Sequence, residues 1–122
     1  MDIRRGQVWW WNCPAHNRKH IQQGKRPVVI VSNDTCNKNS SVVTVVPLTT
    51  SVKYPYPQQV PLVLSHGVSI AIADQITSIP VDELENLVFT LHDFQMDQVD
   101  RAIAVQLGLM NPGDKTHILS KK

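Results

Sequence analysis

The stretch of residues 22–34, Gln-Gln-Gly-Lys-Arg-Pro-Val-Val-Ile-Val-Ser-Asn-Asp, most constrains what this chain can fold into. It passes from a polar, basic segment into four consecutive apolar residues, three of which are valine. A short β-branched run bounded by polar residues is typical of a buried strand. Pro27 suits the first position of that strand, where its missing N–H group costs least. Arg26 is therefore expected where a loop becomes a rigid strand, a position from which a cation can bind phosphate.

The length of 122 residues predicts a single domain, residues 1–122, with one modest core. No apolar run approaches the ~20 residues of a membrane helix. The N-terminus also lacks an apolar segment long enough for a signal peptide. We therefore expect a cytoplasmic protein with no membrane partner, in which Cys13 and Cys36 are reduced thiols. Two isolated cysteines make a poor metal set.

Charge is distributed unevenly along the chain. Residues 1–61 contain eight Lys and Arg against two Asp, which gives +6, whereas residues 62–122 contain four against eight acidic residues, which gives −4. A basic first half can attract a polyanion such as nucleic acid. Chance segregation of surface charge explains the same asymmetry equally well.

Apolar patterning predicts five or six short strands and one C-terminal helix. The expected strands cover residues 7–12, 28–31, 42–46, 59–64, 68–79 and a small piece at 87–91, with loops at 13–25, 34–41 and 52–58 and a helical turn at 81–86. These elements predict a mainly β fold, a small, strongly curved sheet or partial barrel with a helix across it.

The expected helix runs from Asp93, a plausible N-cap, to about Leu109. Apolar residues recur at helical spacing along one face, which is expected to pack on the sheet. The residues of this face are Met96, Val99, Ala102, Ile103 and Leu107.

Three consecutive tryptophans lie in the first expected strand. Strand alternation places Val8 and Trp10 on one face and Trp9 and Trp11 on the other. Most of these rings are expected in the core, although one exposed tryptophan could stack on a base.

Four polar residues at or beside strand ends, His20, Arg26, Thr49 and Asp74, would suit RNA cleavage without a metal. In such a reaction the ribose 2′-OH attacks phosphorus, a base takes its proton, and a cation stabilises the added charge. Arg26 offers the cation, Thr49 a hydroxyl donor, and His20 a side chain that titrates near neutral pH.

Each of these residues also has a structural alternative. Arg26 could form an ion pair with Asp34 or Asp74. Asp74 interrupts an apolar alternation, so it could be the base or a carboxylate paired within the fold. A metal site built from His16, His20 and His66 is not favoured by their spacing.

Several ordered blocks resemble the MazF/PemK/Kid toxins, the ribonuclease members of bacterial toxin–antitoxin pairs. The similar blocks are residues 5–10 (Arg-Gly-Gln-Val-Trp-Trp), residues 24–31 (Gly-Lys-Arg-Pro followed by the valine strand), residues 45–51, residues 73–79 and the closing helix. Together the blocks extend over nearly the whole chain and are more specific than any one alone.

The resemblance implies roles for individual residues. The family's arginine and threonine implicated in cleavage fall on Arg26 and Thr49, and the general base proposed in the Kid branch falls on Asp74. His20 matches a histidine proposed to assist. The resemblance and the polar character of neighbouring segments also predict RNA-binding residues, namely Lys19, Lys25, Thr50, Ser51, Lys53, Tyr54 and Gln75.

Two positions depart from the family pattern. Many members have Glu where this chain has Ile21, and the Kid general acid, an arginine, falls on Ile72. His20 or Arg26 would have to donate the proton instead.

The resemblance further implies an SH3-like barrel of the CcdB/MazF-like toxin fold, a homodimer, and cleavage of single-stranded RNA to a 2′,3′-cyclic phosphate and a 5′-OH. It implies no metal or cofactor, and a small antitoxin protein as partner. Two alternatives remain open: a CcdB-like poison of a protein target such as gyrase, and a non-catalytic RNA-binding barrel.

Overall fold

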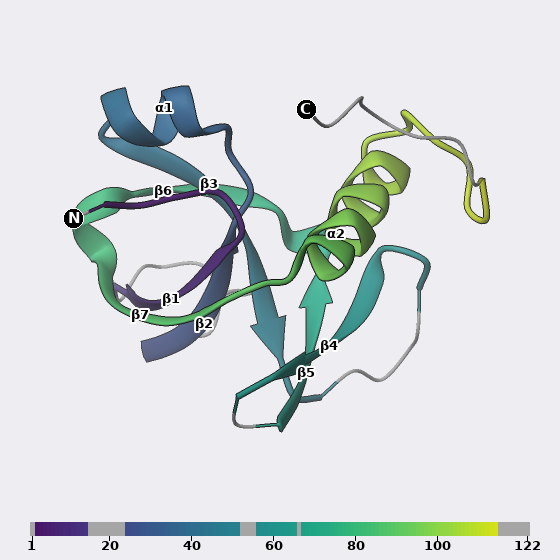
Figure 1. The fold of residues 1–122 in the computed structure, drawn as a ribbon, viewed down its shortest axis with the longest axis horizontal. Helices are drawn as coiled ribbons and strands as arrows, with labels where there is room; N and C mark the ends of the chain where they lie inside the picture. Colours follow the sequence, from purple (N-terminus) through teal and green to yellow (C-terminus); the bar gives the residue numbers. More distant parts are fainter. Residues whose placement is uncertain (1, 15–23, 52–55, 66, 115–122) are drawn as a thin grey trace.

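The computed structural model describes residues 2–14, 24–51, 56–65 and 67–114. Within these ranges the chain forms seven strands, two α-helices and two short 3-10 turns (Figure 1). In chain order the elements are β1 (Gln7–Cys13), β2 (Gly24–Ile30), α1 (Asp34–Asn39), β3 (Val42–Thr49), β4 (Gln59–Leu64), β5 (Gly67–Ile72), η1 (Ala73–Gln75), β6 (Thr77–Pro80), η2 (Val81–Glu83), β7 (Leu84–Thr90) and α2 (Asp93–Gln106). Neither helix is long and apolar enough to cross a membrane, as judged over the described ranges.

All strand pairs are antiparallel, and β3 lies at the centre of the sheet. The strand order is β4-β5-β3-β2-β1-β7, and β6 pairs with the first half of β3. Along one edge, β3 therefore pairs with β6 at Val42–Val45 and with β5 at Leu48 and Thr49. Figure 1 shows the resulting curl, with β1, β2, β3, β6 and β7 around a barrel and the β4–β5 hairpin beside α2.

The middle of the sheet is buried on both faces, whereas Val63, Val68 and Leu87 on the outer strands are exposed. On β2, Val28 and Ile30 point into the barrel, whereas Val29 contacts the core beneath α2. The barrel core contains Trp9, Trp11, Val28, Ile30, Val43, Val45, Ile79 and Leu84. The second core contains Val8, Val29, Val46, Leu48, Leu62, Met96 and Val99. Burial on both faces explains the continuous apolar run of β2, and the predicted mainly β fold with a partial barrel and a C-terminal helix is confirmed.

The tryptophans divide as strand alternation predicts. Trp9 and Trp11 are 7% and 4% exposed in the barrel core, whereas Trp10 is half-buried on the other face. The Trp11 indole N–H donates to Glu83 at 2.8 Å, so its polar atom is satisfied although the ring is buried.

Two local predictions near Arg26 were wrong. Strand β2 begins at Gly24, so Arg26 lies inside the strand and not at a loop boundary, and Pro27 is not its first residue. Residues 34–39, expected in a loop, form α1. The Asn33 side chain accepts the Cys36 N–H at 2.8 Å and caps that helix. Asparagine favours loops and N-caps for the same reason, so composition alone did not separate the two.

The expected strand at 68–79 is interrupted. Strand β5 ends at Ile72, η1 follows, and β6 begins at Thr77. The predicted helical turn at 81–86 is also shorter, because only Val81–Glu83 are helical and β7 starts at Leu84. Both errors arise where a strand changes its partner, which leaves no local sequence signal.

Helix α2 confirms the predicted core face in part. Met96, Val99 and Ala102 are buried, but Leu107 is 56% exposed because the helix ends at Gln106. The N-cap is His92 and not Asp93, since the His92 N–H donates to the Gln95 side chain at 2.9 Å in a capping box.

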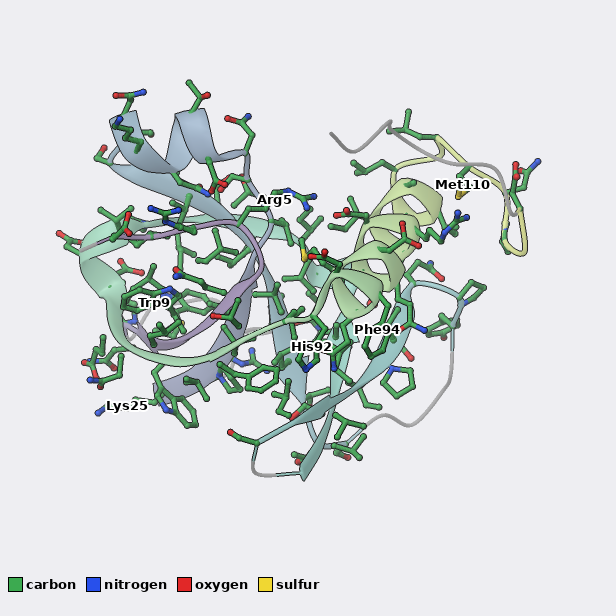
Figure 2. All side chains as sticks on the ribbon, in the orientation of Figure 1. Arg5, Trp9, Lys25, His92, Phe94 and Met110 are labelled. Atoms are coloured by element: carbon green, nitrogen blue, oxygen red, sulfur yellow. The ribbon has the colours of Figure 1, made fainter. Side chains whose placement is uncertain are left out.

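Arg5 ties the N-terminal segment to α2 (Figure 2). Its guanidinium donates two hydrogen bonds to the Asp100 carboxylate and, through Nε, one to the Val31 carbonyl at 3.1 Å. The Arg5 backbone N–H donates to Asp34 at the start of α1 at 2.7 Å. One arginine therefore connects the end of β2, α1 and the helix that covers the second core.

We expect Arg5→Met to lower the free energy of unfolding by about 1–3 kcal/mol, because a charged hydrogen-bond pair is lost and Asp100, only 12% exposed, keeps its charge. Urea denaturation followed by circular dichroism measures this change. Arg4→Met is the matched control: the Arg4–Asp2 pair is 67% and 80% exposed, so its loss should leave the urea midpoint unchanged. Equal midpoint shifts in both variants would contradict the structural role of Arg5.

Candidate active site

Arg26 lies near the start of β2, directly opposite Trp11 of β1. Alternation places its side chain on the barrel face of the sheet, beyond Val28 and the end of the barrel core. The side chain is partly buried, and among the described residues its Nε atom is buried without a hydrogen-bond partner. A buried guanidinium N–H that has no acceptor is costly, so an acceptor from outside the chain would stabilise it.

The other three described arginines each form an ion pair. These pairs are Arg4 with Asp2, Arg5 with Asp100, and Arg101 with Asp97. The alternative in which Arg26 pairs with Asp34 or Asp74 is not found in the described ranges. Arg26 is thus a partly buried cation that no described carboxylate neutralises, and it is free to bind an anionic ligand.

Thr49 is the last residue of β3. The β2–β3 register ends at the pair Val28 and Pro47, and continuing it by two residues would bring Thr49 opposite Arg26 on the same face. At that point β3 pairs with β5, where Thr49 lies opposite Ile70. The half-buried Thr49 hydroxyl accepts the Ser51 N–H at 3.2 Å and contacts the Ser51 carbonyl at 3.3 Å. Thr50 and Ser51 follow as exposed residues.

Asp74 and Gln75 lie exposed on η1, at the other edge of β3. Leu48 pairs with Ala71 and Val45 with Thr77, so six residues of one chain segment span what three span on β3. The extra residues bulge outward as η1. The prediction that Asp74 interrupts an apolar strand face was therefore wrong, because Asp74 lies in a 3-10 turn. The register of the flanking strands places this turn roughly 10 Å along β3 from Thr49.

Lys25 takes part in a contact that sequence reasoning missed. Its ammonium lies 2.8 Å from Oε1 of Glu85 in β7, and the Asn12 side chain of β1 donates to Oε2 at 3.0 Å. The hydrogen bond and charge of Lys25, together with the bond from Asn12, hold the pKa of Glu85 below its ordinary value. Glu85 was assigned to a helical turn, so its position beside β1 and β2 could not be inferred.

Several predicted site residues lie outside the described ranges. They are Lys19, His20, Lys53 and Tyr54, together with Ile21, His16 and His66. Within the described residues, no three His, Cys, Asp or Glu side chains gather as metal ligands.

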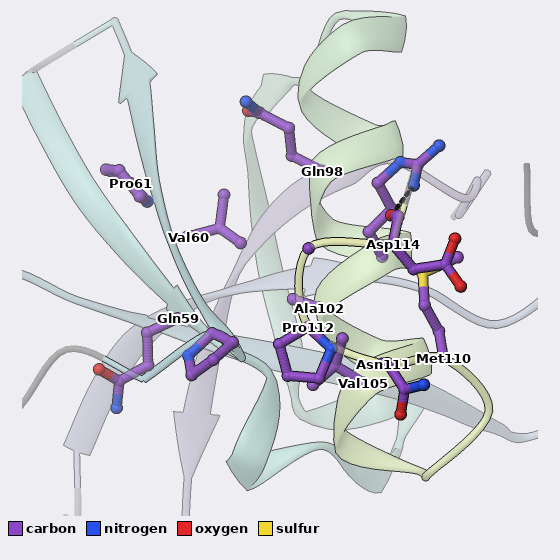
Figure 3. Close-up of a pocket in the computed structure, with 13 residues that line it drawn as sticks. Gln59, Val60, Pro61, Gln98, Ala102, Val105, Met110, Asn111, Pro112 and Asp114 are labelled. Atoms are coloured by element: carbon purple, nitrogen blue, oxygen red, sulfur yellow. Dashed lines mark hydrogen bonds between the residues drawn. The ribbon is translucent and has the colours of Figure 1, made fainter. Parts of the chain in front are cut away.

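A cavity of about 530 Å³ lies away from Arg26, between β4, α2 and the turn that follows α2 (Figure 3). Its lining is mainly apolar, and the Arg101 guanidinium closes one side by donating to the Asp114 carbonyl at 2.9 Å. The apolar lining includes Val60, Pro61, Ala102, Val105, Met110 and Pro112. Its two charged lining residues are Arg101, which forms an ion pair with Asp97, and Asp114, so the partly buried Arg26 remains the centre of the candidate active site.

The family model described as "PemK-like, MazF-like toxin of type II toxin-antitoxin system" matches residues 4–107. The chain belongs to this toxin family. The match includes β1, β2, β3 and η1, the elements that carry Arg26, Thr49 and Asp74. The predicted MazF/PemK/Kid resemblance is therefore confirmed.

Curated relatives agree with this assignment. The chain is 33% identical over 117 residues to endoribonuclease MazF9 of Mycobacterium tuberculosis, covering 88% of this chain and 98% of the relative. It is also 33% identical over 115 residues to endoribonuclease MazF of Staphylococcus epidermidis, covering 89% and 94% of the two proteins.

Solved structures show the same fold. An endoribonuclease in complex with its cognate antitoxin, from a mycobacterial species, matches with a TM-score of 0.74 and 30% identity over 90% of this chain and 99% of that one. MazF of Deinococcus radiodurans matches with a TM-score of 0.75 at 24% identity over 88% and 98% of the two chains. The curled sheet and closing helix of this toxin are thus those of its family.

Replacing Lys25 should return the pKa of Glu85 toward its ordinary value, since the main cause of the lowered pKa is removed. Carboxyl ¹³C NMR titration of the wild-type protein and Lys25→Gln measures this change. In the wild type, the ion pair favours the folded state above the unfolded-state pKa and is lost as pH falls through the lowered folded-state pKa. Lys38→Gln replaces an exposed lysine on α1 and should leave the pKa of Glu85 unchanged.

Proposed function

We propose that this chain is the endoribonuclease toxin of a type II toxin–antitoxin pair, which cuts single-stranded RNA at a short sequence and needs no metal. Its family membership and its 33% identity to two proteins named endoribonuclease support the activity. The observation that carries the proposal is Arg26, a partly buried cation that pairs with no described carboxylate and whose Nε has no acceptor among the described residues.

The proposed reaction is an internal phosphoryl transfer. The ribose 2′-oxygen forms a bond to the adjacent phosphorus, and the bond from phosphorus to the 5′-oxygen of the next nucleotide breaks. The products are a 2′,3′-cyclic phosphate and a 5′-OH end. This route consumes no water in the cleavage step, and it requires the 2′-OH that distinguishes RNA from DNA.

Arg26 stabilises the negative charge on the non-bridging oxygens of the reacting phosphate. Its planar fork can donate to two non-bridging phosphate oxygens, whose negative charge increases in the transition state. The Nε atom, which lacks an acceptor in the described structure, would gain one on substrate binding. A guanidinium is a permanent cation, so this role suits it better than proton transfer.

Thr49 supplies a second donor to the same phosphate. Its hydroxyl already accepts the Ser51 N–H, which orients the oxygen while leaving its proton available to an anionic acceptor. In the structure the Thr49 hydroxyl donates to the Ser51 carbonyl with an Oγ1···O distance of 3.3 Å, a long hydrogen bond that would be exchanged for a stronger one to phosphate. The phosphate would then lie between two neighbouring strands.

Asp74 and His20 carry the proton transfers in this proposal. Asp74 removes the 2′-OH proton, with His20 assisting, and His20 or Arg26 protonates the 5′-oxygen. Ile72, at the position of the family's acid, is 6% exposed and apolar, so it cannot serve. Asp74 and Thr49 are roughly 10 Å apart along β3 by register. For both to act together, one bound nucleotide must reach from the end of β3 to η1.

The remaining predicted contacts hold the RNA strand. The residues proposed for this role are Lys19, Lys25, Thr50, Ser51, Lys53, Tyr54 and Gln75. We further propose a homodimer in the cytoplasm and an antitoxin with an acidic segment that covers the RNA-binding surface. The basic first half of the chain and the relative solved with its cognate antitoxin support that partner.

Arg26→Ala should reduce the cleavage rate about 10²–10³-fold, because one well-placed donor to the transition state is removed. RNA cleavage in EDTA, with mapping of 5′-OH ends, measures the rate, the recognition sequence and the metal requirement together. Lys38→Ala removes the same charge from an exposed position on α1 and should retain activity.

Other outcomes would assign a different function. Full activity of Arg26→Ala would reject the mechanism. Activity lost in EDTA and restored by a divalent cation would reject metal independence. Growth arrest with intact RNA and damaged DNA would indicate a CcdB-like poison, and RNA binding without cleavage would indicate a non-catalytic barrel.

If Asp74 is the base, Asp74→Asn should lower the cleavage rate by about 10²–10⁴-fold and remove the fall in rate at acidic pH. The pH–rate profile of the variant distinguishes this from a loss of folding. Asp82→Asn is the matched control, since Asp82 is also an exposed aspartate in a 3-10 turn. A wild-type profile for Asp74→Asn would exclude Asp74 as the base and leave the Arg26–Thr49 pair untouched.

A further inference from the structure

Glu85 makes a contact for which the proposed reaction has no use. It lies on β7, an edge strand of the sheet, and its carboxylate binds Lys25, the residue directly before Arg26. Figure 2 shows Lys25 projecting from the end of β2 at which the candidate active site lies. One of the predicted RNA-binding cations is therefore already occupied by an anion of the protein itself.

Three strands contribute to this contact. Asn12 and Lys25 are direct partners across β1 and β2, so their side chains share one face. The Glu85 carboxylate accepts from Lys25 through one oxygen at 2.8 Å and from Asn12 through the other at 3.0 Å. An ammonium and an amide donor, each bound to a separate anionic oxygen, are equally suited to two oxygens of a phosphate.

We propose that Glu85 is an internal competitor of the RNA backbone: it binds Lys25 and Asn12 in the free protein, and a phosphate of bound RNA replaces it on these donors. This inference rests on the proposed function, because it names a residue that tunes RNA binding at that site. Glu85 touches no reacting atom and acts only through Lys25 and Asn12.

Exposure makes this exchange feasible. The Lys25 and Glu85 side chains are 60% and 33% exposed, and ion pairs in such positions are weak and readily broken. The pair therefore does little for the fold, but it offsets one cation that precedes Arg26 in the chain and lies on the opposite face of β2. Binding to phosphates is independent of sequence, so a lysine held by Glu85 reduces RNA affinity without reducing base readout. Glu85 would thereby weaken binding to target and arbitrary RNA alike, and so limit how tightly the free protein binds RNA of any sequence.

The test uses a single-stranded 2′-O-methyl oligoribonucleotide, which lacks the attacking hydroxyl and cannot be cut by the proposed route. Fluorescence anisotropy over a series of salt concentrations gives the dissociation constant and its salt dependence. Glu85→Gln keeps an acceptor for Asn12 and removes the charge. It should tighten binding by about two- to fivefold at low salt. It should also steepen the slope of log K against log salt by about 0.7, the value of one additional phosphate contact.

Two controls separate competition from a general change in charge. Asp82→Asn removes one negative charge from an exposed residue that forms no ion pair in the described structure, and it should leave the slope unchanged. In the Lys25→Gln background, Glu85→Gln should have no further effect on the slope, because the ammonium group for which Glu85 and phosphate compete has been removed. Glu85→Ala provides a second variant should the glutamine variant fold poorly, which the thermal midpoint reveals.

Equal slopes in Glu85→Gln and Asp82→Asn, or weaker RNA binding by Glu85→Gln, would overturn the inference. Persistence of the Glu85→Gln effect without Lys25 would also overturn it. Failure of the proposed function has a separate signature, since wild-type protein would then leave unmodified single-stranded RNA uncut. Cleavage with unchanged salt slopes would reject only the role of Glu85.

Discussion

The structure depends on β3 being hydrogen-bonded along both edges and buried on both faces. One edge pairs with β2, and the other is divided between β6 and β5. Val43 and Val45 face the barrel core, while Val46 and Leu48 face the core beneath α2. A strand constrained in this way has one register, because a slip by one residue would exchange the two cores. Continued by two residues past the pair Val28 and Pro47, that register would bring Thr49 opposite Arg26.

Arg26, the cation of the candidate site, differs from Arg5 in the acceptors that surround its guanidinium. Arg5 lies against a mostly buried carboxylate and joins three elements, and its charge is neutralised within the fold. Arg26 is partly buried too, yet its Nε has no acceptor in the described part of the chain. Two arginines of this chain thus serve different purposes. A guanidinium with a carboxylate partner holds the structure together, whereas one that no described carboxylate neutralises can bind a phosphate.

Short-range patterns predicted much of the fold. The valine run, the alternating tryptophans and the spacing of Met96, Val99 and Ala102 each specify a face, and the structure bears those faces out. Errors occurred at element boundaries, namely at the start of β2, at α1, at the N-cap of α2, and at η1, η2 and the start of β7. Local propensity is weak there, since β structure is stabilised by neighbours that are distant in sequence.

The sequence by itself determined the family, the fold class and the identity of the residues placed at the site, because ordered blocks and apolar periodicity are properties of the chain alone. Only the tertiary structure decided which residues are neighbours. It continued the register of β3 and β2 toward Thr49 and Arg26, placed Asp74 in a 3-10 turn at the other edge of β3, and brought Glu85 to Lys25. These arrangements join segments that are distant in the sequence, and they depend on strand register and on one bulge. Neither is encoded in any short segment, because both emerge when two cores are packed against the same sheet.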